Sequence, residues 1–322
     1  MKTFLFRHSK PTTAHLKPMT DISFIIVNWN TRDLLLECLT SIYRTVSAPP
    51  FEVWLVDNGS SDGSVAAAKK RFPGIHAIEN SNNLGFAAAA NLALARMGGR
   101  YAVLLNTDAT LTDGAIAQLY QFMQANPTVG IACGQLLNCD GSRQNSVANF
   151  PSLVSLASNE ALLQLLFPRR FPGKRQEYTG PIEVDSCIGA CMMVRKEAID
   201  HVGPLDERYF FFMEETDWAY RMKRSGWRCF FVPWARITHA QGKSVEGRAD
   251  ARIMFYRSRY AFFKKWHSGS YPLVCGVIFC RLLVNTLLSI SGVALTLGLK
   301  KNLKKKLSVY AQLIAWHMNG CP

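Results

Sequence analysis

Residues 101–110, YAVLLNTDAT, begin as an apolar run and end in the polar residues Asn106, Thr107 and Asp108. A short apolar run bounded by turn residues is typical of a strand buried on both faces of a sheet. Polar side chains after such a strand are costly to bury unless they are hydrogen-bonded or hold a ligand. Ligands of open α/β sheets bind at the carboxyl ends of the strands. We therefore expect Asp108 to lie in a ligand site.

The alternation of apolar runs and helical patterns extends on both sides of this stretch. Strands are expected at residues 22–28, 51–57, 75–80, 101–106 and 129–137. Helical patterns separate them at residues 31–45, 60–72, 86–97 and 112–127, with Ser60 or Ser61 and Thr112 or Asp113 as N-caps. Strands that alternate with helices predict parallel βαβ units and an α/β fold.

The second half of the chain is less regular at residues 140–182. A strand followed by a short helix is expected at 182–199, and a helix with acidic residues at its start at 213–227. Two further strands are expected at 228–233 and 235–239. Polar residues also follow the earlier strands, at Asn28, Asn30, Asp57, Asn82 and Asn83.

The C-terminal tail carries most of the excess positive charge. The chain has 37 Lys and Arg against 23 Asp and Glu, and no acidic residue follows Asp250. Basic residues flank the stretch 271–299, which is apolar except for Arg281. Because about 20 apolar residues suffice for a membrane span, this stretch is long enough to cross. A single span would leave one basic flank outside, against the positive-inside preference.

We therefore expect the tail to form a hairpin or an in-plane segment on the anionic surface of a membrane, with a bend at residues 289–292. The alternative is a helical hairpin buried against the rest of the chain or against a second copy in a homodimer. Nucleic acid is the other anionic partner of a basic tail, and we rank it lower because the charges flank an apolar run.

The nine cysteines are scattered, and no CxxC pair occurs among them. This spacing argues against a disulfide framework and against a zinc site. We expect buried, reduced thiols and a cytosolic location. The apolar region near the N-terminus is too short for a signal peptide, so residues 1–20 are expected to form a flexible arm.

The turn after the first strand, NWNTRD, contains no glycine, and no P-loop occurs in the chain. A dinucleotide fold of the GxGxxG type is therefore not expected. If this fold binds a nucleotide, a divalent metal on a strand-end carboxylate is the obvious means of neutralising the phosphates, and Asp108 is placed for it.

An ordered set of motifs resembles family-2 glycosyltransferases, most closely a bacterial rhamnosyltransferase-like branch. The motifs are FIIVNWN (24–30), VDNGSSDGS (56–64), NNLGFAAAAN (82–91), LLNTD (104–108), the segment 189–227 with GACMMVRKEAI and MEETDWAYRMKRSGW, and ITHAQGKS (237–244). The resemblance covers residues 21–245. It implies a GT-A fold, which is a Rossmann-like mixed sheet flanked by helices. It also implies a nucleotide-diphospho-sugar donor, a divalent metal (Mn or Mg) and inversion at the anomeric carbon.

The resemblance assigns donor-binding and metal-binding roles to individual residues. Asp57 would hold the nucleobase; the alternative is that it caps the turn of residues 58–64. The family's DxD motif reads Asn106-Thr107-Asp108 here, so Asp108 would be the main metal ligand and His239 a second one. Further donor-binding positions are Asn28, Asn30, Asn83, Gly85 and Gly189. Gly85 is also expected to permit a tight turn into the helix that follows.

The segment MEETDW matches the family's EDxD motif, whose second acid is the catalytic base. That position is Glu215, a glutamate where an aspartate is usual. Glu214 and Asp217 are alternates for the base. The three acids could instead only complement the N-terminus of the helix.

These inferences predict an inverting, metal-dependent glycosyltransferase. We expect it to move a sugar, with rhamnose favoured, from a dTDP- or UDP-sugar to a lipid-linked surface-polysaccharide acceptor at the cytoplasmic face of the inner membrane. Residues 21–250 would form the catalytic domain and 251–322 the membrane-associating tail. The alternative is a non-catalytic scaffold that keeps the nucleotide fold and binds membrane or nucleic acid through the tail.

Overall fold

The computed structural model describes residues 20–240, 249–297 and 299–320. The expected N-terminal arm lies outside the described residues except for Thr20. The last four residues of the ITHAQGKS motif also lie outside them.

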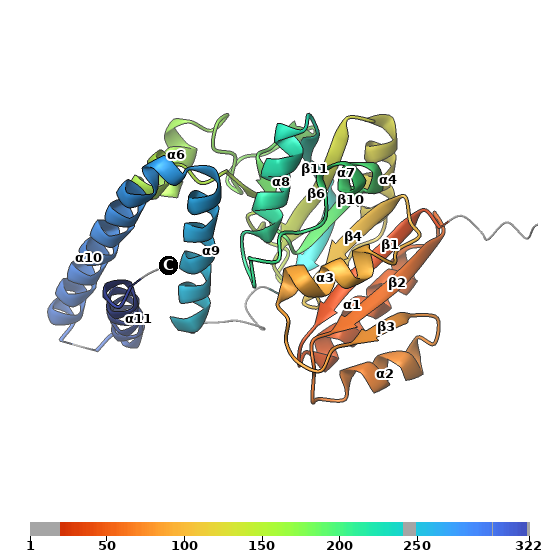
Figure 1. Cartoon of the computed structure of the whole chain (residues 1–322), viewed down its shortest axis with the longest axis horizontal. Coiled ribbons are helices and arrows are strands. Elements are labelled where there is room, and N and C mark those ends of the chain that lie inside the picture. The colour runs from red at the N-terminus through yellow and green to blue at the C-terminus, as the bar shows by residue number, and fades with distance from the viewer. Residues whose placement is uncertain (1–19, 241–248, 298, 321–322) are drawn as a thin grey trace, which may run out of the picture.

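The described residues contain a nine-stranded sheet in the order β3-β2-β1-β4-β10-β6-β11-β5, with β8 paired to β11 (Figure 1). The bounds are β1 (Ile22–Asn28), β2 (Phe51–Asp57), β3 (His76–Glu79), β4 (Tyr101–Leu105), β5 (Ala109–Leu111), β6 (Val129–Leu137), β8 (Ile182–Glu183), β10 (Cys191–Arg195) and β11 (Arg228–His239). A separate pair joins β7 (Val147–Ala148) and β9 (Ser186–Cys187). The two strands expected at 228–233 and 235–239 are one strand with a break in register.

The described part of the first 240 residues also forms helices, most of which flank this sheet. They are α1 (Arg32–Thr45), α2 (Ser64–Arg71), α3 (Phe86–Leu94), α4 (Ala115–Ala125), α5 (Leu153–Ala157), α6 (Glu160–Leu166), α7 (Lys196–Val202) and α8 (Glu214–Arg224). The tail contributes α9 (Ala249–Trp266), the short turn η1 (Ser268–Ser270), α10 (Tyr271–Leu295) and α11 (Lys301–Met318).

The expectation of parallel pairing is confirmed for β1, β2, β3 and β4. It does not hold for β10, which runs antiparallel to both β4 and β6. Cys191, the first residue of β10, pairs with Leu105 at the carboxyl end of β4. The irregular segment between β6 and β10 therefore delivers the chain to the carboxyl edge, and the next strand must run back from there. The sheet is mixed, as the resemblance implies.

Apolar side chains from both faces of the sheet are buried under helices. On one face, α1 and α4 supply residues such as Leu39, Ile42 and Leu119, each 0% exposed. On the other face, the alanine-rich side of α3 packs together with Trp218 of α8. This two-sided burial is why the strands read as continuous apolar runs rather than alternating ones.

Two expected helix caps are wrong. The residue before α2 is Gly63 and the residue before α4 is Gly114, both with positive φ and without a side-chain cap. Asp62, not Ser60 or Ser61, accepts a hydrogen bond from the Ser64 N–H. Thr112 donates its hydroxyl proton to the carbonyl of Arg236 instead of capping α4.

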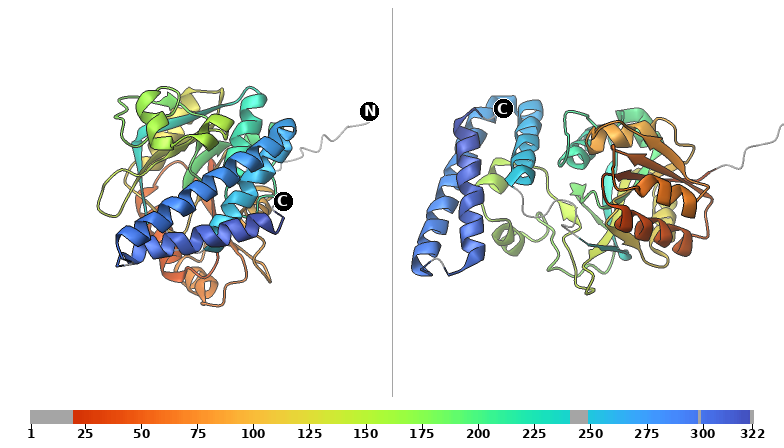
Figure 2. Two further views of the ribbon diagram at one scale, coloured as in Figure 1. Left: turned by 90° about the vertical axis from the view of Figure 1, so that its left-hand side faces the viewer. Right: turned by 90° about the horizontal axis from the view of Figure 1, so that it is seen from below.

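The tail forms a third cluster beside the sheet domain, and α9 lies between that domain and the other two tail helices (Figures 1 and 2). The bend expected at residues 289–292 is wrong, because α10 continues unbroken to Leu295 and the chain reverses before α11. Gly292 instead permits close packing of the two helices, since a Cβ there would lie 3.3 Å from Leu303 Cδ1.

Candidate active site

A cavity of about 520 Å³ opens where the carboxyl end of β4, the end of β11 and the start of α8 meet. Among the residues that line it are Asn106, Asp108, Gly189, Ala190, Glu214, Glu215 and His239. They come from positions up to 133 residues apart in the chain. The structure thus gathers the expected metal ligands and the expected base around one space.

Asp108 and His239 lie next to one another in the lining of this cavity. Asp108 Oδ1 lies 3.3 Å from His239 Nε2, and both side chains are largely buried. The Nδ1 atom of the ring is 2.9 Å from Oε1 of Gln144. Gln144 donates through its amide nitrogen to Asn138 and to the main-chain carbonyl of His239. Its Oε1 is therefore the acceptor, so Nδ1 carries a proton, and in the neutral ring Nε2 presents a lone pair.

This arrangement fits a divalent cation. A lone pair on Nε2 and a carboxylate oxygen repel one another unless a cation or a proton lies between them. Two ligands about 2.1 Å from one ion in octahedral geometry are about 3 Å apart, close to the separation of these two atoms. No group of three or more His, Cys, Asp or Glu side chains suited to a metal occurs among the described residues. Mg²⁺-type sites commonly use one or two protein ligands together with phosphate oxygens and water.

Glu214 and Glu215 stand side by side at the start of α8, in different surroundings. Glu215 is partly exposed to the cavity and lies against Gly189, whose Cβ position is 3.8 Å from Glu215 Cγ. Burial raises the pKa of Glu215 to about 7. Burial, followed by the charge of Glu215, raises the pKa of Glu214 well above its usual value. One oxygen of Glu214 has no hydrogen-bond partner among the described residues. Burial therefore favours the protonated form of Glu214, and Glu215 is the carboxylate that faces the cavity and can accept a proton.

Asp217, an alternate for the base, does not fit that role. It is 0% exposed and accepts hydrogen bonds from Tyr209, Arg221, Lys265 and Trp266. Because Lys265 and Trp266 belong to α9, this carboxylate attaches the tail to α8. Four donors leave Asp217 no free position toward a substrate, so we correct the sequence interpretation to a structural role.

The backbone before α8 is held in an unusual conformation. Phe212 and Met213 have φ angles of +68° and +71°. Each such residue costs about 1–3 kcal/mol, and such strain clusters at functional sites. Both residues line the cavity. Their conformation turns the chain so that Glu214 and Glu215 enter it at the first turn of the helix.

Asn28 and Asp57 lie at the carboxyl ends of β1 and β2, as expected, but they bind one another. Asn28 is 0% exposed and donates to Asp57 Oδ1 at 2.7 Å. The other oxygen of Asp57 accepts from the Ser60 N–H at 2.8 Å. A direct contact of Asn28 with a donor is inconsistent with its complete burial, and we correct that expectation. Asp57 caps its turn, the alternative that the sequence left open, and it does not line the cavity.

Asn30, Asn83 and Gly85 organise the neighbouring loops outside the cavity lining. Asn30 Oδ1 accepts from the Ser61 N–H, and Asn83 Oδ1 accepts from the Gly85 N–H. Gly85 has φ +83°, which confirms the expected tight turn into α3. A Cβ at Gly85 would lie 2.4 Å from the carbonyl oxygen of Phe210. Gly85 thus allows close contact with the loop that leads to Glu214.

Two residues of the site were missed by sequence reasoning. Gln144, which orients His239, lies in the irregular segment where no motif points to it. Arg259 lines the cavity from α9, although the sequence identified it only as one charge of a basic tail. No sequence feature points to Arg259, because nothing in the sequence shows which face of α9 packs against the sheet domain.

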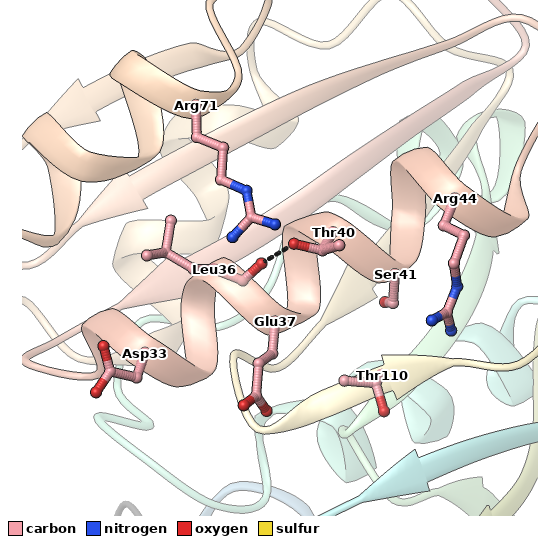
Figure 3. Close-up of a pocket in the computed structure, with 8 residues that line it drawn as sticks. All are labelled: Asp33, Leu36, Glu37, Thr40, Ser41, Arg44, Arg71 and Thr110. Atoms are coloured by element: carbon pink, nitrogen blue, oxygen red, sulfur yellow. Dashed lines mark hydrogen bonds between the residues drawn. The ribbon is translucent and has the colours of Figure 1, made fainter.

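A second hollow of about 670 Å³ lies on the outer side of α1 (Figure 3). Asp33, Glu37 and Arg44 of α1 line it, together with Arg71 from the end of α2 and Thr110 of β5. None of the residues expected to act in binding or catalysis borders this hollow. We therefore place the candidate site at the cavity beside α8.

Comparisons with known proteins agree on one class. The sequence model described as Glycosyl transferase family 2 matches residues 23–203. The N-acetylglucosaminyl-diphospho-decaprenol L-rhamnosyltransferase of Mycobacterium tuberculosis is 30% identical over 268 residues, which cover 78% of this chain and 87% of that protein. A low-salt glycan biosynthesis hexosyltransferase of Haloferax volcanii is 27% identical over 64% of this chain and 62% of its own.

The fold is also that of a solved glycosyltransferase. A mannosyltransferase from Pyrobaculum calidifontis, solved in complex with GDP-Man and Mn²⁺, superposes with a TM-score of 0.56 at 19% identity. The superposition covers 94% of this chain and 88% of that one. The expected GT-A fold with a C-terminal helical tail is confirmed.

Proposed function

This chain belongs to glycosyl transferase family 2, and from that membership we propose that it is an inverting, metal-dependent rhamnosyltransferase. The donor in this proposal is a dTDP- or UDP-linked sugar. The acceptor is a lipid-linked glycan, because the mycobacterial relative is named for transfer to N-acetylglucosaminyl-diphospho-decaprenol.

The observation that carries the proposal is the shared cavity of Glu215, Asp108 and His239. An inverting transfer needs one base that removes the proton of the acceptor hydroxyl as that oxygen attacks the anomeric carbon. A carboxylate with a pKa of about 7 suits this task at neutral pH. Gly189, beside Glu215, leaves room for the acceptor sugar.

Asp108 and His239 would hold a divalent ion, Mn²⁺ or Mg²⁺, with Asn106 as a neutral neighbour at the cavity. When bound, such an ion neutralises the charge that develops on the leaving diphosphate. Gln144 keeps the His239 ring in the tautomer that offers Nε2 to the ion. Asp57 remains our candidate for the nucleobase through the second lone pairs of its oxygens, although its turn already uses both oxygens.

We propose that residues 251–322 attach the enzyme to the cytoplasmic face of the inner membrane, as a peripheral or monotopic tail. The described residues contain one helix, Ser268–Leu295, long and apolar enough to cross a membrane, with a mean hydropathy of 2.1. The boundary at residue 250 separates the two proposed roles and not two separate structural units, because α9 of the tail also lines the cavity. A homodimer that covers α10 is the alternative use of this apolar helix.

The test is the release of nucleoside diphosphate from a panel of dTDP-, UDP- and GDP-sugars, with and without Mn²⁺ or Mg²⁺, in the presence of N-acetylglucosaminyl-diphospho-decaprenol. We expect metal-dependent release from dTDP-rhamnose. Glu215→Gln should abolish release and leave dTDP binding unchanged. Asp108→Ala should remove the metal dependence of donor binding. Absence of release from any donor would instead favour a non-catalytic scaffold.

A further inference from the structure

We propose that Arg259 binds the diphosphate of the acceptor lipid and so selects lipid-diphosphate acceptors. This inference rests on the proposed function, because it takes the acceptor's chemistry from there. It concerns a residue of α9, outside the segment that the family model matches.

Arg259 is a cation without an anion. Its Nε is buried and has no hydrogen-bond partner among the described residues, and no ion pair to its guanidinium occurs among them. The guanidinium carbon lies 4.5 Å from the centre of the Phe255 ring, which covers one face. The side chain as a whole is half-buried, and leaving the buried Nε–H without a partner is costly. A residue in this state, on the wall of a cavity, is poised for an anionic ligand.

A second arginine, Arg281, is exposed and does not line the cavity. Arg281 of α10 donates to the carbonyl oxygens of Leu156 and Ser158, which fixes it at the end of α5. Burial, and after it the charge of Arg281, lowers the pKa of Arg259. Tyr256, Glu160 and Tyr260 act in the opposite direction, and Glu160 is exposed on α6 and also borders the cavity. The planar guanidinium of Arg259 can donate two parallel hydrogen bonds to one phosphate group, which suits a diphosphate.

The position of Arg259 favours the acceptor's diphosphate over the donor's. Asp108 and His239, the groups suited to a donor's metal, come from the sheet edge, whereas Arg259 comes from α9 of the tail. Next to α9 lie α5, α6 and α10 (Figures 1 and 2). Exposed apolar side chains on these helices include Leu165 of α6 and Leu287 and Leu288 of α10, and Phe167, which follows α6, is exposed as well. The helix α9 lies between α8, which carries Glu215, and α10, which carries exposed leucines, as the diphosphate lies between the sugar and the prenyl chain of the lipid (Figure 1).

Binding tests the site without turnover. Geranyl diphosphate, a soluble prenyl diphosphate, is titrated calorimetrically into the full chain saturated with dTDP and Mg²⁺, so that the donor's own diphosphate site is filled. Losing a hydrogen bond to a charged group costs about 1.5–3 kcal/mol, so Arg259→Met should weaken binding by about 10- to 100-fold. Arg259→Lys keeps the charge but lacks the planar guanidinium. Its affinity for geranyl diphosphate should lie between those of the wild type and Arg259→Met.

Arg257→Met is the matched control, because Arg257 is exposed on the same helix and does not border the cavity. We expect it to bind geranyl diphosphate like the wild type. Equal binding by wild type and Arg259→Met would overturn the proposal. A weakened affinity of Arg259→Met for dTDP would also overturn it, because Arg259 would then bind the diphosphate of the donor.

Transfer then separates the two proposals. For N-acetylglucosaminyl-diphospho-decaprenol, Arg259→Met should raise KM by about 10- to 100-fold. For octyl N-acetylglucosaminide, which has no phosphate, kcat/KM should stay within about twofold of the wild type. Equal losses on both acceptors would point to a purely structural role and reject the inference. If the wild type binds geranyl diphosphate but transfers no sugar, the proposed function fails and the diphosphate site stands.

Discussion

At the scale of single residues, the site depends on two adjacent glutamates that differ in burial. Glu214 is 6% exposed and has an unpartnered oxygen, and its burial favours the protonated form. A protonated Glu214 places no second negative charge beside Glu215. Glu215 can therefore lose its proton without placing two negative charges side by side, which would raise its pKa further. The deeper glutamate thus supports the one that faces the cavity.

The first prediction concerns the pH dependence of transfer. A base acts only when it is deprotonated, and the pKa of Glu215 is about 7. We expect kcat/KM to fall about tenfold for each unit of pH below that value. The measurement is initial-rate kinetics between pH 5 and 9 with saturating metal. A flat profile down to pH 5 would contradict the assignment of Glu215 as the base.

The stability of the fold provides the control for this titration. A raised pKa means that the folded state holds the Glu215 proton more tightly than the unfolded state. Between pH 4.5, the usual pKa, and about 7, the contribution of Glu215 to the free energy of unfolding therefore falls as the pH rises. Glu215→Gln should remove this part of the pH dependence in denaturant unfolding. Unfolding with an unchanged pH slope would show that the shift belongs to Glu214.

The second prediction concerns Gln144, which orients His239. Substitutions of groups that orient a metal ligand typically cost 10- to 100-fold in metal affinity. Gln144→Met should raise the Mn²⁺ concentration needed for half-maximal donor turnover by about that factor. Gln144→Glu, which keeps an acceptor for Nδ1, should recover part of the loss. Unchanged Mn²⁺ dependence in Gln144→Met would show that His239 does not bind the ion.

Sequence reasoning singled out residues of the motifs that lie together in the structure, and it misjudged residues whose surroundings depend on burial. Asp108, Glu215 and His239 follow recognisable segments, and they meet in one cavity. Asn28 also follows a strand, but it is fully buried and holds the turn of Asp57. A polar residue after a strand can serve a ligand or a turn, and only the fold distinguishes the two. Gln144 carried no signal because its segment has no periodicity.

At the scale of helices and strands, apolar runs predicted where the strands lie in the sequence but not the direction in which each strand runs in the sheet. β1, β2 and β6 have the expected bounds. The antiparallel direction of β10 could not be read from its sequence, since it depends on the path of the irregular segment before it. The caps failed for a related reason: glycines with positive φ precede α2 and α4, so the neighbouring Ser and Thr side chains are free to bond elsewhere.

The third prediction tests the contact between α3 and the loop before α8. In Gly85→Ala, the new Cβ would lie 2.4 Å from the Phe210 carbonyl oxygen, and φ at this position is +83°. We expect a loss of about 1–3 kcal/mol of unfolding free energy. Because the displaced loop continues into Glu214 and Glu215, kcat should fall by a larger factor than the affinity for dTDP.

Gly74→Ala provides the matched control for this substitution. No atom lies within 4 Å of the Cβ position of Gly74. Denaturant unfolding and transfer kinetics of both variants decide the matter. If Gly85→Ala kept wild-type stability and kcat, the contact with Phe210 would not position the loop.

At the scale of the whole molecule, α9 connects chemistry to the tail. Its Lys265 and Trp266 bind the buried Asp217 of α8, and its Phe255 and Arg259 border the cavity. Beyond α9, the cluster around Val274, Ile278 and Leu313 holds α10 and α11 together. The orientation of the tail is therefore fixed relative to Glu215, so a surface bound by the tail would lie at a fixed position relative to the cavity.

The fourth prediction concerns what covers α10. This helix has 25 residues and is therefore about 37 Å long, yet only 22% of its most apolar window is buried. Leu287 and Leu288 are 63% and 66% exposed, and the lysine-rich start of α11 follows the helix. Apolar side chains beside lysines suit the interface of an anionic membrane. Burying a leucine there contributes about 1.5–3 kcal/mol.

The double substitution Leu287→Asp and Leu288→Asp should therefore reduce binding to vesicles that contain anionic lipid at least tenfold, as measured by co-sedimentation. Ala66→Asp, on the exposed side of α2, adds a negative charge far from the tail and should leave binding unchanged. Added salt should weaken the wild type because it screens the lysines. If the wild type instead sediments as a dimer that the double substitution splits, and binds vesicles no better than the variant, then a second copy covers α10 and the membrane assignment is wrong.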